Sequence, residues 1–279
     1  MSNSSNKGVA LITGASSGIG AVYADRLSRR GYDLILVARN ETRLKSLSAR
    51  LASETGRSLK VLPADLGNKA DLAKVEAKLR DDASVTLLVN NAGVASVAPL
   101  LSADVEKMDD LIGLNITALT RLTYAAAPAF VGRGAGTIIN IASTVGISPE
   151  SLNGVYGASK AYVLALSHSL QHELADKGIR IQAVLPGATA TDLWEKAGLP
   201  WQKLPAEIVM STEDMVDAAL AGLDQGELVT IPGLQDGDEW TRFEAARRAL
   251  SQHFGNSAPA PRYRTADTQK VRGRATTSS

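Results

Sequence analysis

The chain has 279 residues, 44% of them hydrophobic, and a formal net charge of +1. This length suits one α/β domain, and the near-neutral charge gives no electrostatic argument for a nucleic-acid or membrane partner. Cysteine is absent, which excludes disulfides and thiol chemistry. Residues 1–8 are polar, and no apolar run approaches the ~20 residues needed to span a bilayer. We therefore expect a cytoplasmic protein without a signal peptide.

Short apolar runs alternate with longer helical patterns along the chain. Most of the apolar runs are continuous, as in parallel strands that are buried on both faces. The expected strands are Val9–Ile12, Leu34–Ala38, Leu59–Leu62, Val85–Asn90, Thr137–Ile141, Ile181–Leu185 and Leu228–Ile231. The expected helices are about Gly18–Arg30, Lys69–Arg80, Ala103–Val131, Tyr156–Ala175 and Glu213–Leu223. This alternation predicts an α/β fold, a Rossmann-like doubly wound sheet of about seven mainly parallel strands with helices on both faces.

The pattern changes after Ile231. Residues 239–254 (Glu239–Phe254) favour one more amphipathic helix, and the chain from Asn256 onward has almost no large apolar residues. We predict a single nucleotide-binding and catalytic domain over residues 1–255 and a disordered tail over residues 256–279. The tail holds five basic residues and one acid. A solvated tail is the favoured interpretation, and a contact with an anionic partner is the alternative.

A glycine-rich loop, Thr13 to Gly20, joins the first strand to the first helix. Gly14 allows a sharp turn, Gly18 lets the backbone approach a diphosphate, and Gly20 lets helix and strand pack closely. The free N–H groups of the helix N-terminus favour phosphate. A tight turn alone also needs glycine, but the strand before the loop and the helix after it favour a dinucleotide site. The spacing is Gly-x-x-x-Gly-x-Gly instead of the common Gly-x-Gly-x-x-Gly.

Further motifs follow this loop in order, and together they make the chain similar to the short-chain dehydrogenase/reductase family. They are Asn90-Asn91-Ala92-Gly93 after the fourth strand, Asn115 in the next helix, Ser143 at the end of the fifth strand, Tyr156-Gly157-Ala158-Ser159-Lys160, and Pro186-Gly187 followed by Thr191. The resemblance covers residues 7–232 and implies hydride transfer between a nicotinamide cofactor and a CH–OH or C=O carbon. The final strand and the helix after it resemble a bacterial-type subgroup with undefined substrates.

The resemblance implies four catalytic residues. Tyr156 and Lys160 are four residues apart and so share one face of a helix, where an ammonium would lower the tyrosine pKa from about 10. By resemblance, Tyr156 exchanges the proton, Lys160 binds the nicotinamide ribose and tunes Tyr156, and Ser143 hydrogen-bonds the substrate oxygen. Asn115 helps to hold a water that relays protons. Thr144 is a weaker rival to Ser143, and no metal is needed because the cofactor supplies the hydride.

The end of the second strand predicts the cofactor. An acid there would bind the ribose 2′-hydroxyl of NAD, but this chain has Ala38 followed by Arg39. Arg39 can pair with a 2′-phosphate, and Arg43 could assist, so NADP (NADPH) is favoured over NAD. A merely solvated Arg39 is the alternative. The resemblance also implies cofactor contacts from Gly14, Ser16, Ser17, Gly18, Ile19, Gly20, Asp65, Leu66, Asn91, Ala92, Gly93, Tyr156, Lys160, Pro186, Gly187, Thr189 and Thr191.

The substrate should bind beyond the carboxyl ends of the strands. The segments expected there are Val94–Leu100, Val145–Gly154 and Ala188–Met210. The last, at about 188–210, resembles the family's lid. Its large apolar side chains favour either an apolar pocket or structural packing, and they are Trp194, Leu199, Trp201 and Leu204. We expect Ser143, Tyr156 and Trp194 to contact the substrate, an apolar small molecule with a ketone, aldehyde or alcohol group. By resemblance, the helical stretches Leu111–Phe130 and Tyr156–Ala175 would pair across a two-fold axis, giving a homodimer or homotetramer.

Other functions remain open at this point. An NAD-preferring alcohol dehydrogenase is the second enzymatic hypothesis. A non-catalytic sensor that binds NADP is another, although the intact Ser143, Tyr156 and Lys160 argue against it. A flavin or S-adenosylmethionine protein would leave Tyr156 and Lys160 unexplained. His168 and His172 have metal-site spacing, but a third ligand is not evident, so a helix face or a subunit contact is favoured.

Overall fold

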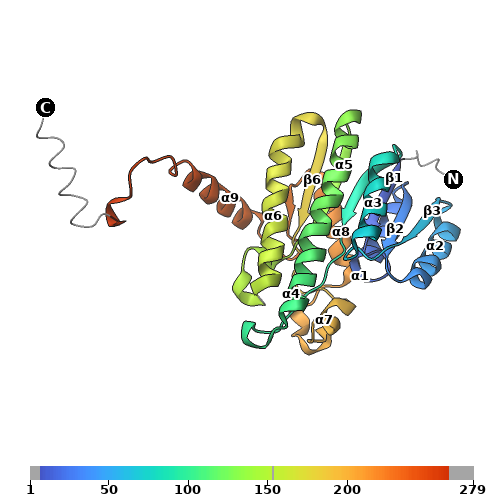
Figure 1. Ribbon diagram of the computed structural model, residues 1–279, viewed down its shortest axis with the longest axis horizontal. Coiled ribbons are helices and arrows are strands. Elements are labelled where there is room, and N and C mark those ends of the chain that lie inside the picture. The colour runs from blue at the N-terminus through green and yellow to red at the C-terminus, as the bar shows by residue number, and fades with distance from the viewer. Residues whose placement is uncertain (1–6, 153, 264–279) are drawn as a thin grey trace, which may run out of the picture. The chain divides into compact units, whose positions relative to one another are not determined.

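The computed structural model describes residues 7–152 and 154–263. They form two compact units, and the first ends at Gly233. Its seven-stranded sheet has the order β3-β2-β1-β4-β5-β6-β7, with every neighbouring pair parallel (Figure 1). The strands are β1 (Val9–Thr13), β2 (Asp33–Ala38), β3 (Leu59–Pro63), β4 (Val85–Asn90), β5 (Gly136–Ile141), β6 (Ile179–Val184) and β7 (Val229–Thr230). The predicted fold class is confirmed.

Helices cover both faces of this sheet, because successive side chains of a strand point to opposite sides. In β1, Ala10 and Ile12 pack in one buried cluster, and Leu11 packs in the other. The first cluster includes side chains of α1 (Gly18–Arg29), α2 (Glu41–Thr55) and α8 (Thr212–Gln225). The second includes side chains of α3 (Lys69–Asp81), α5 (Leu119–Arg133) and α6 (Gly154–Leu174). Continuous apolar runs are therefore the strands that are buried on both sides.

Helix α2 was not among the expected helices. It begins after Asn40, whose side chain accepts a hydrogen bond of 2.9 Å from the backbone N–H of Arg43, and it ends at Gly56 with a φ of 67°. Its buried Leu44 and Leu51 and the partly buried Leu47 pack in the first cluster at the i, i+3, i+7 spacing of an amphipathic helix. The helix matters for the site because its first turn presents Arg43 at the end of β2.

The long helix expected over Ala103–Val131 has a different form. It consists of α4 (Val105–Ile112), a π-helical segment (Gly113–Ala118) and α5. π-helical turns inside α-helices often occur at functional sites. Asn115 lies within this segment and is buried.

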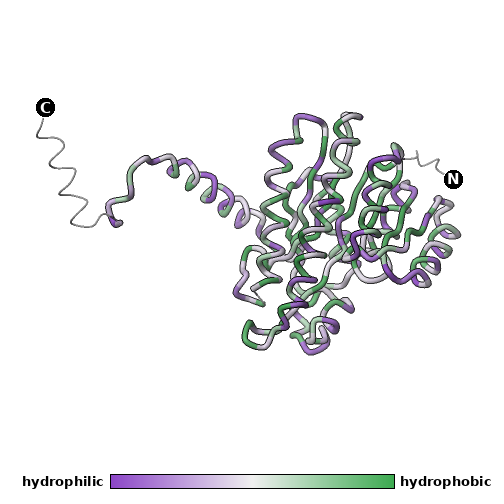
Figure 2. Tube along the Cα trace, viewed as in Figure 1, coloured by the Kyte–Doolittle hydropathy of each residue, from purple (hydrophilic) through white to green (hydrophobic). Residues whose placement is uncertain are grey.

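The second compact unit contains α9 (Gly237–Ser251), close to the helix expected at Glu239–Phe254. It is mostly hydrophilic (Figure 2), and Trp240 and Phe243 stack with ring centres 5.2 Å apart. Of the predicted tail, residues 264–279 lie outside the described residues. The single domain expected over residues 1–255 stays a prediction. In the described ranges, no helix combines the length and apolar character needed to cross a bilayer.

Candidate active site

The glycine-rich loop turns directly from β1 into α1. Gly14 and Gly18 have positive φ angles of 65° and 53°, a conformation that favours glycine. A Cβ atom on Gly20 would lie 2.4 Å from the carbonyl oxygen of Gly14, so a side chain there would push the helix off the strand. The start of α1 therefore packs against the end of β1, with its free N–H groups near the loop, an arrangement suited to a phosphate.

The Asn90-Asn91-Ala92-Gly93 motif after β4 forms hydrogen bonds that hold the start of the glycine-rich loop in place. The side chain of Asn91 donates a hydrogen bond of 2.9 Å to the carbonyl oxygen of Thr13. The backbone N–H groups of Asn91 and Ala92 donate to the hydroxyl of Thr13 at 2.9 and 3.0 Å. These bonds join the carboxyl ends of β1 and β4, where the strand order reverses and ligands of doubly wound folds bind.

A cavity of about 470 Å³ opens along the carboxyl ends of the strands. Most of the site residues expected from the sequence line it. They are Gly14, Ser16, Ser17, Gly18, Ile19, Arg39, Asp65, Leu66, Asn91, Ala92, Gly93, Ser143, Tyr156, Lys160, Pro186, Gly187, Thr189, Thr191 and Trp194. Gly20 and Asn115 lie behind this lining. One cleft thus brings together segments that are far apart in the sequence.

Ser143, Tyr156 and Lys160 meet at one end of the cleft. The Ser143 hydroxyl donates a hydrogen bond of 3.3 Å to the carbonyl oxygen of Pro186, and the Ser143 side chain also lies close enough to the Tyr156 phenol to act on its pKa. The Lys160 ammonium lies 5.8 Å from the centre of the Tyr156 ring and donates a 2.9 Å hydrogen bond to the carbonyl oxygen of Ile141. The end of β5 and the first turns of α6 thus hold a phenol, a hydroxyl and an amine side by side.

Burial decides the protonation of these groups. It raises the pKa of Tyr156 to about 12, although the neighbouring Ser143 side chain acts in the opposite direction. It lowers the pKa of Lys160 to about 8. Lys160 was expected to lower the pKa of Tyr156. Among the protein groups alone, that expectation is wrong, because desolvation of the buried phenol dominates and raises its pKa. At neutral pH, Tyr156 is therefore a protonated phenol beside a mostly protonated amine.

Asn115 connects the segment after β4 to α6. Its side-chain oxygen accepts a hydrogen bond from the backbone N–H of Val94 at 2.9 Å. Its amide donates to the carbonyl oxygen of Val94 at 2.9 Å and to the hydroxyl of Ser159 at 3.1 Å. A Cβ atom on Gly93 would lie 3.0 Å from the Asn115 oxygen and 3.7 Å from the Lys160 nitrogen, so both groups flank Gly93. The expected water-holding role of Asn115 stays a prediction.

The opposite end of the cleft carries two arginines on the surface. The Arg39 side chain is 71% exposed, and its guanidinium lies 4.0 Å from the carboxylate of Asp65. Arg43 lies 3.6 Å from Asp192, the first residue of α7 (Asp192–Lys196). Sequence reasoning found both arginines but missed Asp192. Little in the sequence distinguishes Asp192, because any lid segment contains charged residues.

Apolar side chains surround the catalytic end. Trp194 lines the cavity as expected, whereas Leu199, Trp201 and Leu204 do not. Seven further apolar residues line the cavity, and all but Leu114 fall in the segments expected at the substrate side. They are Val94, Ala95, Val97, Leu114, Val145, Leu152 and Leu193. No group of three or more His, Cys, Asp or Glu residues suited to a metal ion occurs in the described parts of the chain.

Comparisons with known proteins agree with this geometry. Residues 8–200 match the family model of the short chain dehydrogenases. An uncharacterized oxidoreductase of Staphylococcus epidermidis is 32% identical over 224 residues, which are 80% of this chain and 94% of the relative. A very-long-chain 3-oxoacyl-CoA reductase of Anas platyrhynchos is 34% identical over 189 residues, which are 66% of this chain and 60% of that protein.

Two solved structures are more similar. The short-chain dehydrogenase from Sphingobium yanoikuyae in complex with NADPH is 50% identical, with a TM-score of 0.90 over 92% of this chain and 100% of the other. The bulky-bulky ketone specific alcohol dehydrogenase from Comamonas testosteroni is 44% identical, with a TM-score of 0.87 over 94% and 100% of the two chains. This chain therefore belongs to the short-chain dehydrogenase/reductase family and is an oxidoreductase of alcohol and carbonyl groups.

Proposed function

We propose that the chain reduces ketones or aldehydes with NADPH, with Tyr156 as the proton donor. The observation that carries the proposal is that Ser143, Tyr156 and Lys160 lie together in the lining of a cleft that begins at the glycine-rich loop, with the Lys160 nitrogen 5.8 Å from the centre of the Tyr156 ring. Tyr156 would protonate the carbonyl oxygen, and Ser143 would donate a hydrogen bond to it as charge develops. NADPH, when bound, supplies the hydride. A phenol that keeps its proton at neutral pH suits the reducing direction.

The residues of the cleft fit a dinucleotide with a 2′-phosphate. The loop around Gly14 and Gly18 would hold the diphosphate, and Lys160 would hold the nicotinamide ribose. At the other end, Ala38 stands where an acid would select NAD, and the Arg39 guanidinium is accessible. The NADPH in the Sphingobium structure supports this choice. Titration with NADP(H) and NAD(H) tests it, and equal affinities would contradict it.

We further propose that the substrates are ketones with two bulky apolar substituents. Apolar side chains of three segments line the catalytic end of the cleft, including Val94, Leu152 and Trp194. Burial of apolar surface would stabilise a hydrocarbon substituent by about 25 cal/mol per Å². The Comamonas relative, described as bulky-bulky ketone specific, supports this substrate class.

A panel of carbonyl compounds tests the proposal. It should pair each ketone bearing two large groups with an analogue in which one group is a methyl, and follow the loss of NADPH absorbance. We expect higher kcat/KM for the doubly substituted member of each pair. Preference for the methyl ketones would contradict the substrate class, and failure to reduce any member would contradict the reductase itself.

We also propose that the protein is a homodimer or homotetramer in the cytoplasm. Tyr124 on α5 is 67% exposed and Tyr162 on α6 is 36% exposed, so both expected interface helices carry accessible aromatic rings. Small apolar residues on such helices allow close packing between subunits. Light scattering at micromolar concentration should give a multiple of the 29.3 kDa chain mass. Cell fractionation checks the location.

A further inference from the structure

Asp192 links the lid segment, residues 188–210, to the arginines at the cofactor end of the cleft. Its carboxylate lies 3.6 Å from the Arg43 guanidinium, and both side chains are about half exposed, at 57% and 55%. Arg43 belongs to the first turn of α2, and Asp192 begins α7. Both line the same cavity as Arg39. The pair therefore joins the wall of the cofactor cleft to the first turn of the lid.

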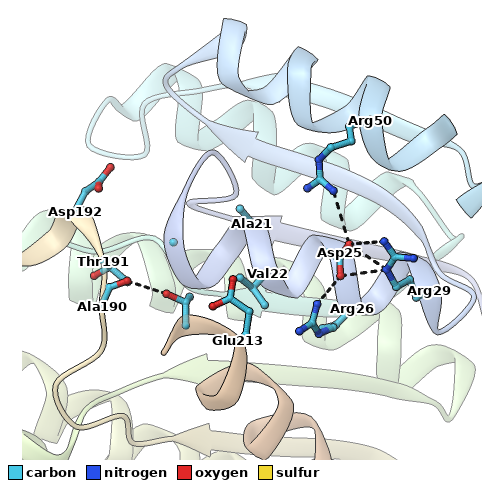
Figure 3. A pocket seen from close by; sticks show the side chains of 12 residues that line it. Ala21, Val22, Asp25, Arg26, Arg29, Arg50, Ala190, Thr191, Asp192 and Glu213 are labelled. Atoms are coloured by element: carbon cyan, nitrogen blue, oxygen red, sulfur yellow. Dashed lines mark hydrogen bonds and ion pairs between the residues drawn. The ribbon is translucent and has the colours of Figure 1, made fainter. Parts of the chain in front are cut away.

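The base of the lid segment is fixed by hydrogen bonds at both of its ends. The backbone N–H of Ala190 donates to Met210 at 3.0 Å, and that of Met210 donates to Ala188 at 2.9 Å. The hydroxyl of Thr212 donates to the carbonyl oxygen of Ala190 at 2.8 Å (Figure 3). Asp192 lies two residues after Ala190, which belongs to this base. A change in what Asp192 contacts thus acts on α7 while the base holds its position.

Thr191 and Asp192 line the cofactor cleft and also a second hollow. That hollow is lined by α1, the start of α8 and residues 190–192, and it contains Asp25 with the surrounding Arg26, Arg29 and Arg50 (Figure 3). These arginines are already paired with carboxylates, for example Arg26 with Asp25 at 2.7 Å. Arg43, with a single half-exposed acid at 3.6 Å, is more available for exchange than they are.

We propose that Asp192 is a specificity-determining residue that competes with the 2′-phosphate of NADP for Arg43. The inference rests on the proposed use of NADP. A phosphate held by Arg39 would draw the Arg43 guanidinium toward itself and repel the Asp192 carboxylate, because like charges repel. NADP would thereby release α7 from α2, whereas NAD, which lacks this phosphate, would leave the pair intact. The state of the lid would then depend on which cofactor is bound.

A double-mutant cycle with nucleotide affinity as readout tests this exchange. Asp192→Asn should tighten NADP+ binding about two- to fivefold, the size expected for a half-exposed ion pair, and leave NAD+ affinity unchanged. In an Arg43→Gln background the same change should lose most of its effect, because the exchange needs the guanidinium. The matched control is Glu195→Gln, which removes the same charge from an exposed residue of α7 outside the cavity lining.

Hydrogen exchange provides a second readout that needs no nucleotide. The amides of α7 should exchange faster in Asp192→Asn than in the unmodified protein, and Glu195→Gln should leave their exchange unchanged. Equal effects of the two substitutions on NADP+ affinity and on exchange would overturn the inference. An unmodified enzyme that binds NAD+ as tightly as NADP+ would instead overturn the proposed cofactor, so the two failures are distinguishable.

Discussion

The two ends of the cleft are built in opposite ways. At the catalytic end, Tyr156 and Lys160 are buried, and burial shifts the pKa of each. At the adenosine end, Arg39 and Arg43 are more than half exposed, and their nearest acids lie at 4.0 and 3.6 Å. A proton transfer needs groups with fixed positions and tuned pKa values, whereas recognition of a phosphate needs accessible charge. Changes at the first end should therefore be large and selective for turnover, and changes at the second should be smaller and selective for affinity.

The largest expected effect is at Tyr156. Tyr156→Phe keeps the ring and its packing but removes the proton that we propose is transferred, so kcat should fall at least about 100-fold while the Kd for NADPH stays nearly constant. Steady-state kinetics and cofactor titration measure the two effects. Tyr162→Phe is the matched control, because it removes a hydroxyl from the same helix that contacts Thr120 outside the cleft. A Tyr156→Phe enzyme that reduces carbonyls at a near-normal rate would show that the catalytic residue lies elsewhere.

Arg39 should give the next largest effect, on affinity instead of turnover. Arg39→Ala removes the proposed charge-assisted contact to the 2′-phosphate, of about 1.5–3 kcal/mol, and we therefore expect a roughly ten- to hundredfold rise in the NADP(H) Kd. NAD(H) affinity should change little. Arg80→Ala, on α3 and outside the cleft, controls for the loss of a surface arginine. Equal loss of affinity for both nucleotides would show that Arg39 does not bind the 2′-phosphate.

The sequence could indicate which residues lie together at the proposed catalytic end, for a physical reason. Tyr156 and Lys160 are joined by helix geometry, and Ser143 follows a strand with a continuous apolar pattern. The glycine-rich loop also fixes its own shape, since Gly14 needs a positive φ and Gly20 has no room for a side chain. These features depend on local rules, which a single sequence displays.

The adenosine end was harder to predict because it depends on contacts between distant segments. The pair of Arg43 and Asp192 needs both the start of α2 and the fold of the lid segment, which lie far apart in the sequence. The pKa of Tyr156 depends on how deeply the ring is buried, which the Tyr-x-x-x-Lys spacing does not encode. Burial and long-range pairing are therefore what the structure adds to the sequence.

Raising the pH should lower turnover at the catalytic end, with a smaller effect than the two substitutions above. Lys160 has its pKa lowered by burial from 10.5 to about 8, so its ammonium form is lost as the pH rises through about 8. If that cation supports Tyr156, kcat for reduction should be level below this range and then fall up to about tenfold per pH unit. A kcat profile measured at saturating NADPH checks this expectation. A level profile up to pH 10 would contradict a role for the charge of Lys160.

Deprotonation of Lys160 does not lower kcat by unfolding the protein. With its pKa lowered in the folded state, Lys160 keeps its proton in the unfolded chain between about pH 8 and 10.5, while the folded protein has released it. The unfolded state then binds more protons, so this group raises the free energy of unfolding as the pH rises. Thermal unfolding followed in the same buffers would show whether activity falls while the fold persists.

The smallest expected effect is the response to salt, which should differ between the two ends. Exposed charges are screened when the Debye length falls from about 10 Å at 0.1 M to about 3 Å at 1 M, whereas buried pairs are screened much less. Raising KCl across this range should increase the Kd for NADP+ about two- to fivefold through Arg39 and Arg43, the scale of exposed ion pairs. The Kd for NAD+ and the kcat at saturating NADPH should change less, because the hydrogen bonds around Ser143, Tyr156 and Lys160 are buried.

Titrations with both nucleotides at matched salt concentrations measure the contrast, and Arg39→Ala should reduce the salt response of NADP+ toward that of NAD+. If kcat fell with salt while the NADP+ affinity stayed constant, the assignment of fixed chemistry to one end and accessible charge to the other would be wrong.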